Sequence, residues 1–203
     1  MVLDCASRRA EGNTLMNKGN VWKFFAAGGI AASLVLAAGS ATAAGFTVTS
    51  SAFADGGMLV RKNAADDPMR MCGGENISPP IAWANPPANT KSFALMLLDP
   101  DGLLGQGVVH WIGYGIPGSA AGLAEGDMTR AGKFVGGKGT RNNANYIGPC
   151  PPVGDSPHHY IFTVVATDLE PSALKADMTR DELMAALKGH SLGGASIVGK
   201  YAR

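Results

Sequence analysis

Glycine and proline restrict the folds open to this chain more than any other feature of its sequence. The 203 residues include 28 glycines and 12 prolines, about one residue in five. Because both residues interrupt helices and favour turns, this content favours short strands joined by many turns over a helical bundle. The length is sufficient for one domain with its own hydrophobic core. We therefore expect a single compact, turn-rich domain.

The overall charge does not indicate a nucleic-acid partner. Basic residues number 17 and acidic residues 16, which gives a formal net charge of +1. A protein that follows a phosphate backbone carries a clear excess of lysine and arginine, so we expect no nucleic acid among its partners. The hydrophobic fraction of 46% is also too high for a disordered chain.

The first 43 residues have the organisation of a secretory signal peptide. Lys18 and Lys23 precede an apolar stretch over 24–38, and Ala41-Thr42-Ala43 then fit the small-residue pattern of a cleavage site. A retained transmembrane anchor is the alternative interpretation. The apolar stretch is nevertheless shorter than the roughly 20 residues that a spanning helix needs, and no basic cluster follows it. The pattern therefore predicts export and cleavage.

Cleavage after Ala43 would leave one domain over residues 44–203, periplasmic or secreted and without a stable membrane anchor. Met16 stands where a signal peptide of ordinary length would begin, which indicates that residues 1–15 are an over-extended start. Two of the three cysteines, Cys72 and Cys150, remain in this domain. An exported pair can form a disulfide, although two unconnected buried thiols would have the same spacing.

The exported region contains six segments of β-type sequence and one of helix-type sequence. Residues 92–98 include a continuous apolar run, typical of a strand buried on both faces. Thr179 and Glu182 have the spacing of a helix capping box, and Gly189 can end that helix. The pattern predicts an antiparallel β-sandwich with one or two short peripheral helices near the C-terminus. The other predicted strands cover residues 46–49, 81–83, 108–116, 160–167 and 196–201.

Polar residues gather next to the predicted strands. Asp99 and Asp101 follow the buried run, one on each side of Pro100, whose fixed φ would hold both carboxylates at the rim of the sandwich. A plain Asx turn explains the same three residues. A stiff loop rich in proline and glycine covers residues 148–154 and leads to three further polar residues at 158–160.

Strand alternation assigns faces to the histidines. Alternation with a period of two puts His110 on the same face as Tyr114 and opposite Trp111. It puts His158 and Tyr160 on one face and the intervening histidine on the other, so we expect one histidine of that pair to join a pocket. A structural histidine, satisfied within the fold, is the alternative for His110, and the second histidine of the pair is expected at the surface.

Taken together, these segments resemble the signature of the phosphatidylethanolamine-binding proteins, a family that includes the Raf kinase inhibitor proteins. The resemblance rests on Asp99-Pro100-Asp101, His110-Trp111, the GPCPPVG loop over 148–154, and His158-His159-Tyr160. Residues 72–79 and 91–94 are similar to the bacterial YbhB/YbcL branch of that family. The resemblance extends over residues 46–203, nearly all of the exported region.

The resemblance implies a Greek-key β-sandwich with a small pocket at its rim for phosphoryl-bearing or other anionic head groups. The chain departs from the family where it has Gly102-Leu103 in place of Ala-Pro, and loss of that proline is expected to loosen the lip of the pocket. The ligand-binding residues that the resemblance implies are Asp99, Asp101, His110, Pro152, His158 and Tyr160.

The expected function is that of an exported, Raf kinase inhibitor-like protein that binds a small phosphoryl or anionic ligand. We expect no cofactor, no metal and no catalytic residue. Because two carboxylates repel a phosphate, the pocket needs compensation from protonated histidines, a protonated carboxyl or a cationic group on the ligand. His110 and His158 can supply positive charge, so we expect affinity to rise as the pH falls toward about 6. Two other functions stay open. One is inhibition of a target protein, such as a protease or a kinase, through surface loops, and the other is hydrolysis dependent on a divalent metal.

Overall fold

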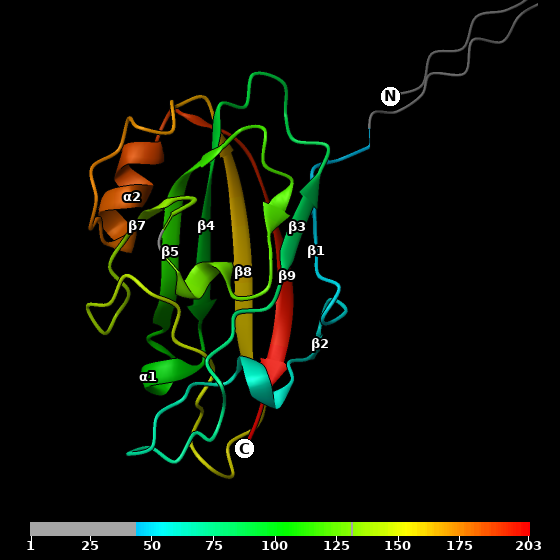
Figure 1. Cartoon of the computed structure of the whole chain (residues 1–203), viewed down its shortest axis with the longest axis vertical. Helices are drawn as coiled ribbons and strands as arrows, with labels where there is room; N and C mark the ends of the chain where they lie inside the picture. Colours follow the sequence, from blue (N-terminus) through cyan, green and yellow to red (C-terminus); the bar gives the residue numbers. More distant parts are fainter. Residues whose placement is uncertain (1–43, 131) are drawn as a thin grey trace, which may run out of the picture. The chain divides into compact units, whose positions relative to one another are not determined.

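The structure, a computed structural model, describes residues 44–130 and 132–203. The predicted signal peptide lies outside the described residues. Within them, the chain forms a three-stranded and a six-stranded sheet that share one hydrophobic core (Figure 1). This sheet-dominated architecture confirms the predicted fold class. No helix within the described ranges has the length and apolar character needed to cross a bilayer.

The larger sheet carries most of the domain. Its neighbouring strands pair antiparallel, except that β2 and β9 run parallel. The sequence did not indicate β2, β6 or β7, because two residues are too few to show an alternating pattern. In spatial order the larger sheet contains β2 (Gly57–Met58), β9 (Ser191–Tyr201), β8 (His158–Thr167), β4 (Ser92–Asp99), β5 (Val108–Pro117) and β7 (Val135–Gly136). The smaller, antiparallel sheet contains β1 (Thr47–Thr49), β3 (Ile81–Ala84) and β6 (Gly122–Leu123).

Strand β4 is buried on both faces, as the apolar run over 92–98 predicted. On one face Phe93 and Leu95 belong to the core between the two sheets. On the other face Met96 belongs to a second cluster, which Leu183 and Leu187 of the C-terminal helix help to cover. Each fully buried side chain of this size contributes about 1.5–3 kcal/mol, so β4 anchors both clusters.

Two short α-helices and two 3-10 turns complete the domain. The predicted C-terminal helix is α2 (Arg180–Leu187), and its capping box is confirmed, because Thr179 Oγ1 accepts from the backbone N–H of Glu182 while the Glu182 carboxylate accepts from that of Thr179. Helix α1 (Gly102–Gly105) is a single turn directly after β4 that the sequence did not indicate. The 3-10 turns are η1 (Arg61–Asn63) and η2 (Asp127–Thr129).

A bulge in β5 changes the direction of His110. The partners of Trp111 and Val109 on β4 are consecutive residues, so His110 is an extra residue without a partner of its own. Such a bulge interrupts the alternation of a strand. His110 therefore turns toward Tyr160 on the Trp111 side, with ring centroids 5.3 Å apart. The predicted placement of His110 on the face of Tyr114 is wrong, because alternation assumes a strand without bulges.

A disulfide joins Cys72 to Cys150, with the two Cα atoms 5.4 Å apart. It connects the loop after η1 to the proline-rich loop before β8, across a sequence separation of 78 residues. The spacing of the two cysteines left this pairing open, and the fold brings them together. A link that closes so long a loop restricts the unfolded chain strongly.

Replacing both cysteines with serine is expected to lower the free energy of unfolding by about 4 kcal/mol, because the unfolded chain regains its loop-closure entropy. Chemical denaturation of the wild type and the double variant measures this difference. A thiol reductant should lower the wild type to the level of the variant and leave the variant unchanged. Equal midpoints for the oxidised wild type and the variant would show that the link adds no stability.

Candidate functional site

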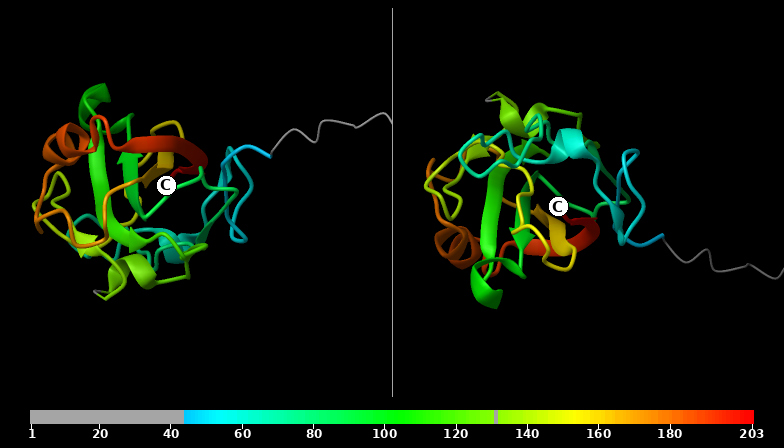
Figure 2. Two further views of the ribbon diagram at one scale, coloured as in Figure 1. Left: turned by 90° about the horizontal axis from the view of Figure 1, so that it is seen from above. Right: turned by 90° about the horizontal axis from the view of Figure 1, so that it is seen from below.

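A cavity of about 390 Å³ opens where β4 ends and β5 and β8 begin. Because β4 runs antiparallel to both neighbours, its last residue lies beside the first residues of each. The C-terminus and the loop before β8 lie at the same end, which the right-hand view of Figure 2 shows from below. Six residues implied by the sequence line this cavity together: Asp99, Asp101, His110, Pro152, His158 and Tyr160.

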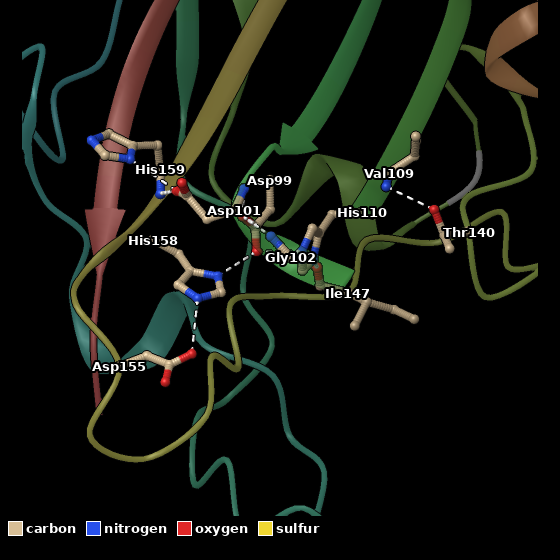
Figure 3. A network of polar contacts seen from close by, with 10 residues as sticks. All are labelled: Asp99, Asp101, Gly102, Val109, His110, Thr140, Ile147, Asp155, His158 and His159. Carbon is tan, nitrogen blue, oxygen red and sulfur yellow. Dashed lines mark hydrogen bonds and ion pairs between the residues drawn. The ribbon is translucent and has the colours of Figure 1, made fainter. Parts of the chain in front are cut away.

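Asp99 is the residue on which the site is organised (Figure 3). Its Oδ1 accepts hydrogen bonds from the backbone N–H groups of Asp101 and Gly102, at 2.9 and 3.0 Å. Its Oδ2 lies 2.9 Å from Nδ1 of His158 and 3.8 Å from Nε2 of His110. Asp99 therefore forms an Asx turn through one oxygen and also lines the cavity, where its other oxygen faces the histidines.

The side chain of Asp99 is buried, yet its surroundings favour the ionised form. Burial raises the pKa of the Asp99 carboxyl, but the interactions with His158 and His110 outweigh burial, so the pKa lies below its ordinary value. The side chain is only 5% exposed. An ionised carboxylate so far from water is tolerated because it accepts three hydrogen bonds and lies beside an imidazole that can carry a proton.

His158 lies between two carboxylates. Its Nδ1 faces Asp99, and its Nε2 lies 3.4 Å from Oδ2 of Asp155, in the loop before β8 (Figure 3). Burial alone would lower the pKa of His158, but the hydrogen bond to Asp99 and the charge of that carboxylate outweigh burial, with Asp155 adding to them. The pKa of His158 is therefore raised, which favours an imidazolium at the floor of the cavity.

His110 and Tyr160 present polar groups beside this pair. Nδ1 of His110 lies 2.7 Å from the carbonyl oxygen of Ile147, so Nδ1 carries a proton and donates it, and Nε2 is left facing Asp99. The hydroxyl of Tyr160 is fully buried and has no hydrogen-bond partner among the described residues. Burial and the Asp99 charge raise the pKa of Tyr160, so its hydroxyl stays neutral and can donate. A buried donor without a partner is costly to leave unpaired, and it lies in the cavity wall.

Asp101 faces a different histidine. Its Oδ2 accepts from the backbone N–H of His159 at 2.7 Å and lies 2.9 Å from Nδ1 of the same residue. The backbone hydrogen bond is the main reason that the pKa of Asp101 lies below its ordinary value. Figure 3 shows this pair apart from the pair that His158 forms with Asp155. As alternation predicted, His158 and Tyr160 share the inner face and His159 lies on the other.

Two arginines and an aspartate line the cavity without having been predicted. Arg70 and Arg141 come from separate loops and both approach Asp67, at 3.6 and 3.9 Å. Asp155 is the third charged lining residue that the sequence analysis did not predict. Loop residues follow no periodicity, so no pattern marked the arginines. The spacing of Asp155 three residues before His158 was the one available signal.

The departure from the family pattern after Asp101 has a local explanation. Leu103 has a φ of 51°, which proline cannot adopt because its ring fixes φ near about −65°. A β-carbon on Gly102 would lie 2.7 Å from Cγ2 of Val108 and 3.2 Å from Oδ2 of Asp99. Glycine at 102 and a residue other than proline at 103 therefore go together with this left-handed turn. That the lip is looser stays a prediction.

A metal centre finds no support in the described part of the chain. No group of three or more His, Cys, Asp or Glu side chains there is placed to hold a metal ion. Asp155 contacts His158, and Asp101 contacts His159, while Asp99 lies near both His158 and His110. The arrangement is one of paired charges around a small polar cavity.

The comparisons with known proteins agree with this geometry. A family model described as phosphatidylethanolamine-binding protein matches residues 49–202. A UPF0098 protein of Methanothermobacter thermautotrophicus is 39% identical over 140 residues, which cover 65% of this chain and 87% of the relative. LppC of Mycobacterium tuberculosis, whose name describes it as a lipoprotein, is 35% identical over 160 residues, covering 76% and 71%.

A solved structure extends the likeness to three dimensions. The crystal structure of YbcL from Escherichia coli, titled a new member of the mammalian PEBP family, superposes with a TM-score of 0.71 at 30% identity. The match covers 79% of this chain and 99% of that one. The curated YbcL sequence is 38% identical over 137 residues, covering 64% of this chain and 73% of YbcL.

The Asp99–His158 pair is expected to stabilise the fold within a defined range of pH. The contribution of Asp99, whose pKa is lowered, is lost as the pH falls below about 3.8, and that of His158, whose pKa is raised, is lost as the pH rises above about 6.5. Asp99→Asn should therefore lower the free energy of unfolding by about 2 kcal/mol between these values and by less outside them.

Chemical denaturation between about pH 2 and about pH 9 measures this difference, because these limits lie below the ordinary pKa of a carboxyl group and above that of an imidazole. Asp168→Asn is the matched control, because Asp168 also pairs with a histidine, His190, at 2.9 Å but lies exposed. It should have a much smaller effect. A difference for Asp99→Asn that does not change with pH would contradict the charged pair.

Proposed function

This chain belongs to the phosphatidylethanolamine-binding protein family, of the YbcL type, and from that premise we propose that its cavity binds small phosphoryl-bearing ligands. The ligand class is an anionic or zwitterionic head group, in which a phosphoryl group enters the cavity. The observation that carries the proposal is the grouping of His158, His110 and the unpartnered hydroxyl of Tyr160 around one buried carboxylate.

The carboxylate supports phosphoryl binding through its neighbours. Oδ1 of Asp99 accepts the hydrogen bonds of the turn, and Oδ2 contacts His158, so both carboxylate oxygens already have partners within the protein. Its charge favours the protonated form of His158, and in the proposed complex the Nε2–H, which lies at a long 3.4 Å from Asp155, turns from that carboxylate to a phosphoryl oxygen. The second carboxylate, that of Asp101, accepts a hydrogen bond from the backbone N–H of His159 and lies beside its ring. Both interactions reduce the repulsion that two carboxylates would exert on a phosphate.

The mouth of the cavity fits a zwitterion. Arg70 and Arg141 line it and share one carboxylate, that of Asp67, so this group of three keeps a net positive charge that favours a phosphoryl group. Asp155 lines it too, and its carboxylate is 49% exposed, so an ammonium group could meet it. Both signs of charge therefore lie within one small cavity, as an ethanolamine-like head group requires.

We further propose that the domain acts outside the cytoplasm. The predicted signal peptide supports export, and the Cys72–Cys150 disulfide is of a kind that persists in oxidising compartments. The relative named as a lipoprotein points in the same direction. The partner in this proposal is a small ligand, and no observation in the described residues favours inhibition of a protease or kinase or a metal-dependent hydrolase.

Calorimetry with phosphorylethanolamine and with inorganic phosphate tests the proposed function. The full chain should bind at least one of them saturably. His158→Gln should weaken binding by about tenfold or more, since it removes a charge-assisted hydrogen bond. His190→Gln is the matched control, because His190 also pairs with an aspartate but lies outside the cavity. Unchanged affinity in His158→Gln, or no binding to either ligand, would contradict the proposal.

Affinity is expected to fall as the pH rises, because His158 loses its proton above about 6.5. Glycerophosphorylethanolamine is the suitable ligand, since its phosphodiester does not titrate near neutral pH and only the protein then changes charge. Calorimetry between about pH 5.5 and pH 8.5, a range that spans a raised histidine pKa, measures the effect. An affinity that stays constant over this range would exclude the imidazolium as a donor to the ligand.

A further inference from the structure

The side chain of Arg203, two residues after β9, joins two loops of the cavity. Its Nε donates to the carbonyl oxygen of Pro151 at 2.7 Å, and its Nη1 donates to those of Arg70 and Met71, both at 2.9 Å. Pro151 lies in the loop before β8 and Arg70 in the loop after η1, and both residues line the cavity. Figure 1 shows both loops at the end of the domain where the C-terminus lies. One guanidinium therefore holds two walls of the site together.

No other basic side chain of residues 44–130 and 132–203 makes a comparable set of contacts. Arg61 donates once to a backbone carbonyl, that of Gly73. The remaining polar contacts of arginine and lysine side chains in these ranges are ion pairs with carboxylates. Hydrogen bonds from a charged donor are stronger than neutral ones, so the three bonds of Arg203 hold the backbone of both loops firmly.

Arg70 is the cavity residue whose position depends most on this contact. Its carbonyl oxygen accepts from Arg203, and its backbone N–H donates to Oδ1 of Asp67 at 3.1 Å. Its side chain is also guided, because its Nε lies 3.6 Å from Oδ2 of Asp67. An exposed loop arginine ordinarily samples many conformations and loses this freedom when it binds a ligand. Here the backbone is held on both sides beforehand, which lowers the entropy cost of binding.

The disulfide between the same loops does not replace Arg203. It fixes the backbone at Cys72, two residues beyond Arg70. Between them, Met71 has a φ of 54°, a left-handed conformation that is costly for methionine. The two carbonyl groups that Arg203 binds belong to the peptide groups on either side of the Met71 α-carbon. These hydrogen bonds therefore stabilise the strained turn next to Arg70.

The guanidinium of Arg70 stays available to a ligand. Within the described ranges its one ion pair uses Nε, and its side chain is 55% exposed. It lines the cavity together with His158. The oxygens of a phosphoryl group point in several directions, so one can accept from His158 and another from the fork of Arg70. A phosphomonoester, with two negative charges, gains more from this second charged donor than a phosphodiester with one.

We propose that Arg203 is a positioning residue, which holds Arg70 at the mouth of the cavity as the second charged donor to a phosphoryl group. This role rests on the proposed function and deepens it, because it gives the same cavity a preference for phosphomonoesters. Arg203 does not line the cavity itself and acts through Arg70. Without its hydrogen bonds, the loop of Arg70 is held by Asp67 and by the disulfide alone.

Calorimetry of the full chain with phosphorylethanolamine and with glycerophosphorylethanolamine tests this role. At about pH 7 the phosphoryl group of the monoester carries nearly two negative charges and that of the diester carries one. The wild type should bind the monoester more tightly. Arg203→Gln should weaken monoester binding about fivefold or more, and diester binding by less. Arg203→Lys should behave like Arg203→Gln, because lysine keeps the charge but lacks the fork that reaches all three carbonyl groups.

Arg61→Gln is the matched control. Arg61 also donates from Nε to a carbonyl oxygen of the loop after η1, that of Gly73 at 2.7 Å, but it does not line the cavity. This variant should bind both ligands like the wild type. A double-mutant cycle then shows how Arg203 acts. In an Arg70→Gln background, Arg203→Gln should weaken binding by less than about twofold, since the side chain that it positions is gone.

The Nε–H signals of the wild-type arginines provide a test by NMR that needs no variant. Saturating phosphorylethanolamine should shift the signal of Arg70. The signal of Arg203, whose Nε–H donates to Pro151, should stay in place and exchange slowly with water, both with and without ligand. A shift at Arg203 larger than that at Arg70 would make Arg203 a direct ligand contact and contradict a positioning role.

Three results of the calorimetry would also overturn this role. The first is wild-type affinity for phosphorylethanolamine in Arg203→Gln or in Arg203→Lys, and in the second variant it would assign the effect to charge alone. The second is an equal effect of Arg203→Gln with and without Arg70, which would make Arg203 a residue of the fold only. The third is equal affinity of the wild type for the monoester and the diester. A wild type that binds neither phosphorylethanolamine nor inorganic phosphate would instead contradict the proposed function itself.

Discussion

The ionised carboxylate of Asp99 is the constraint on which the rest of the site depends. A buried charge costs several kcal/mol unless it is paired and hydrogen-bonded, and this one is satisfied by the turn into α1, by His158 and by the approach of His110. Those partners come from the end of β4, the start of β5 and the start of β8. The three strands must therefore reach their final register before the charge is compensated, which couples the chemistry of the cavity to the folding of the sheet.

The fold supplies this arrangement through a few local departures from regularity. The bulge in β5 turns His110 inward, and the left-handed turn after Asp101 excludes a proline there. The disulfide and the side chain of Arg203 hold together the loops that form the mouth. A polar cavity with paired charges thus opens at the end of the sheet where β4 ends and β5 and β8 begin.

Much of this could be predicted from the sequence. The apolar run over 92–98 indicated the central strand, the Thr179 capping box indicated α2, and family resemblance brought together six of the residues that line the cavity. The side of β5 on which His110 lies could not be predicted, because a bulge leaves no mark in an alternating pattern. The lining arginines and the left-handed residues Leu103 and Leu104 were missed for a related reason, since loops from distant parts of the chain meet only once the sheet has formed.

The most direct test of the account is an NMR titration of the full chain with glycerophosphorylethanolamine, following the ring protons of its histidines. The account predicts that the signals of His110 and His158 shift together and saturate with one ligand, while those of His190, which pairs with Asp168 away from the cavity, stay in place. Shifts of His190 equal to those of His158, or no shift at His158 under saturating ligand, would contradict a phosphoryl site organised around Asp99.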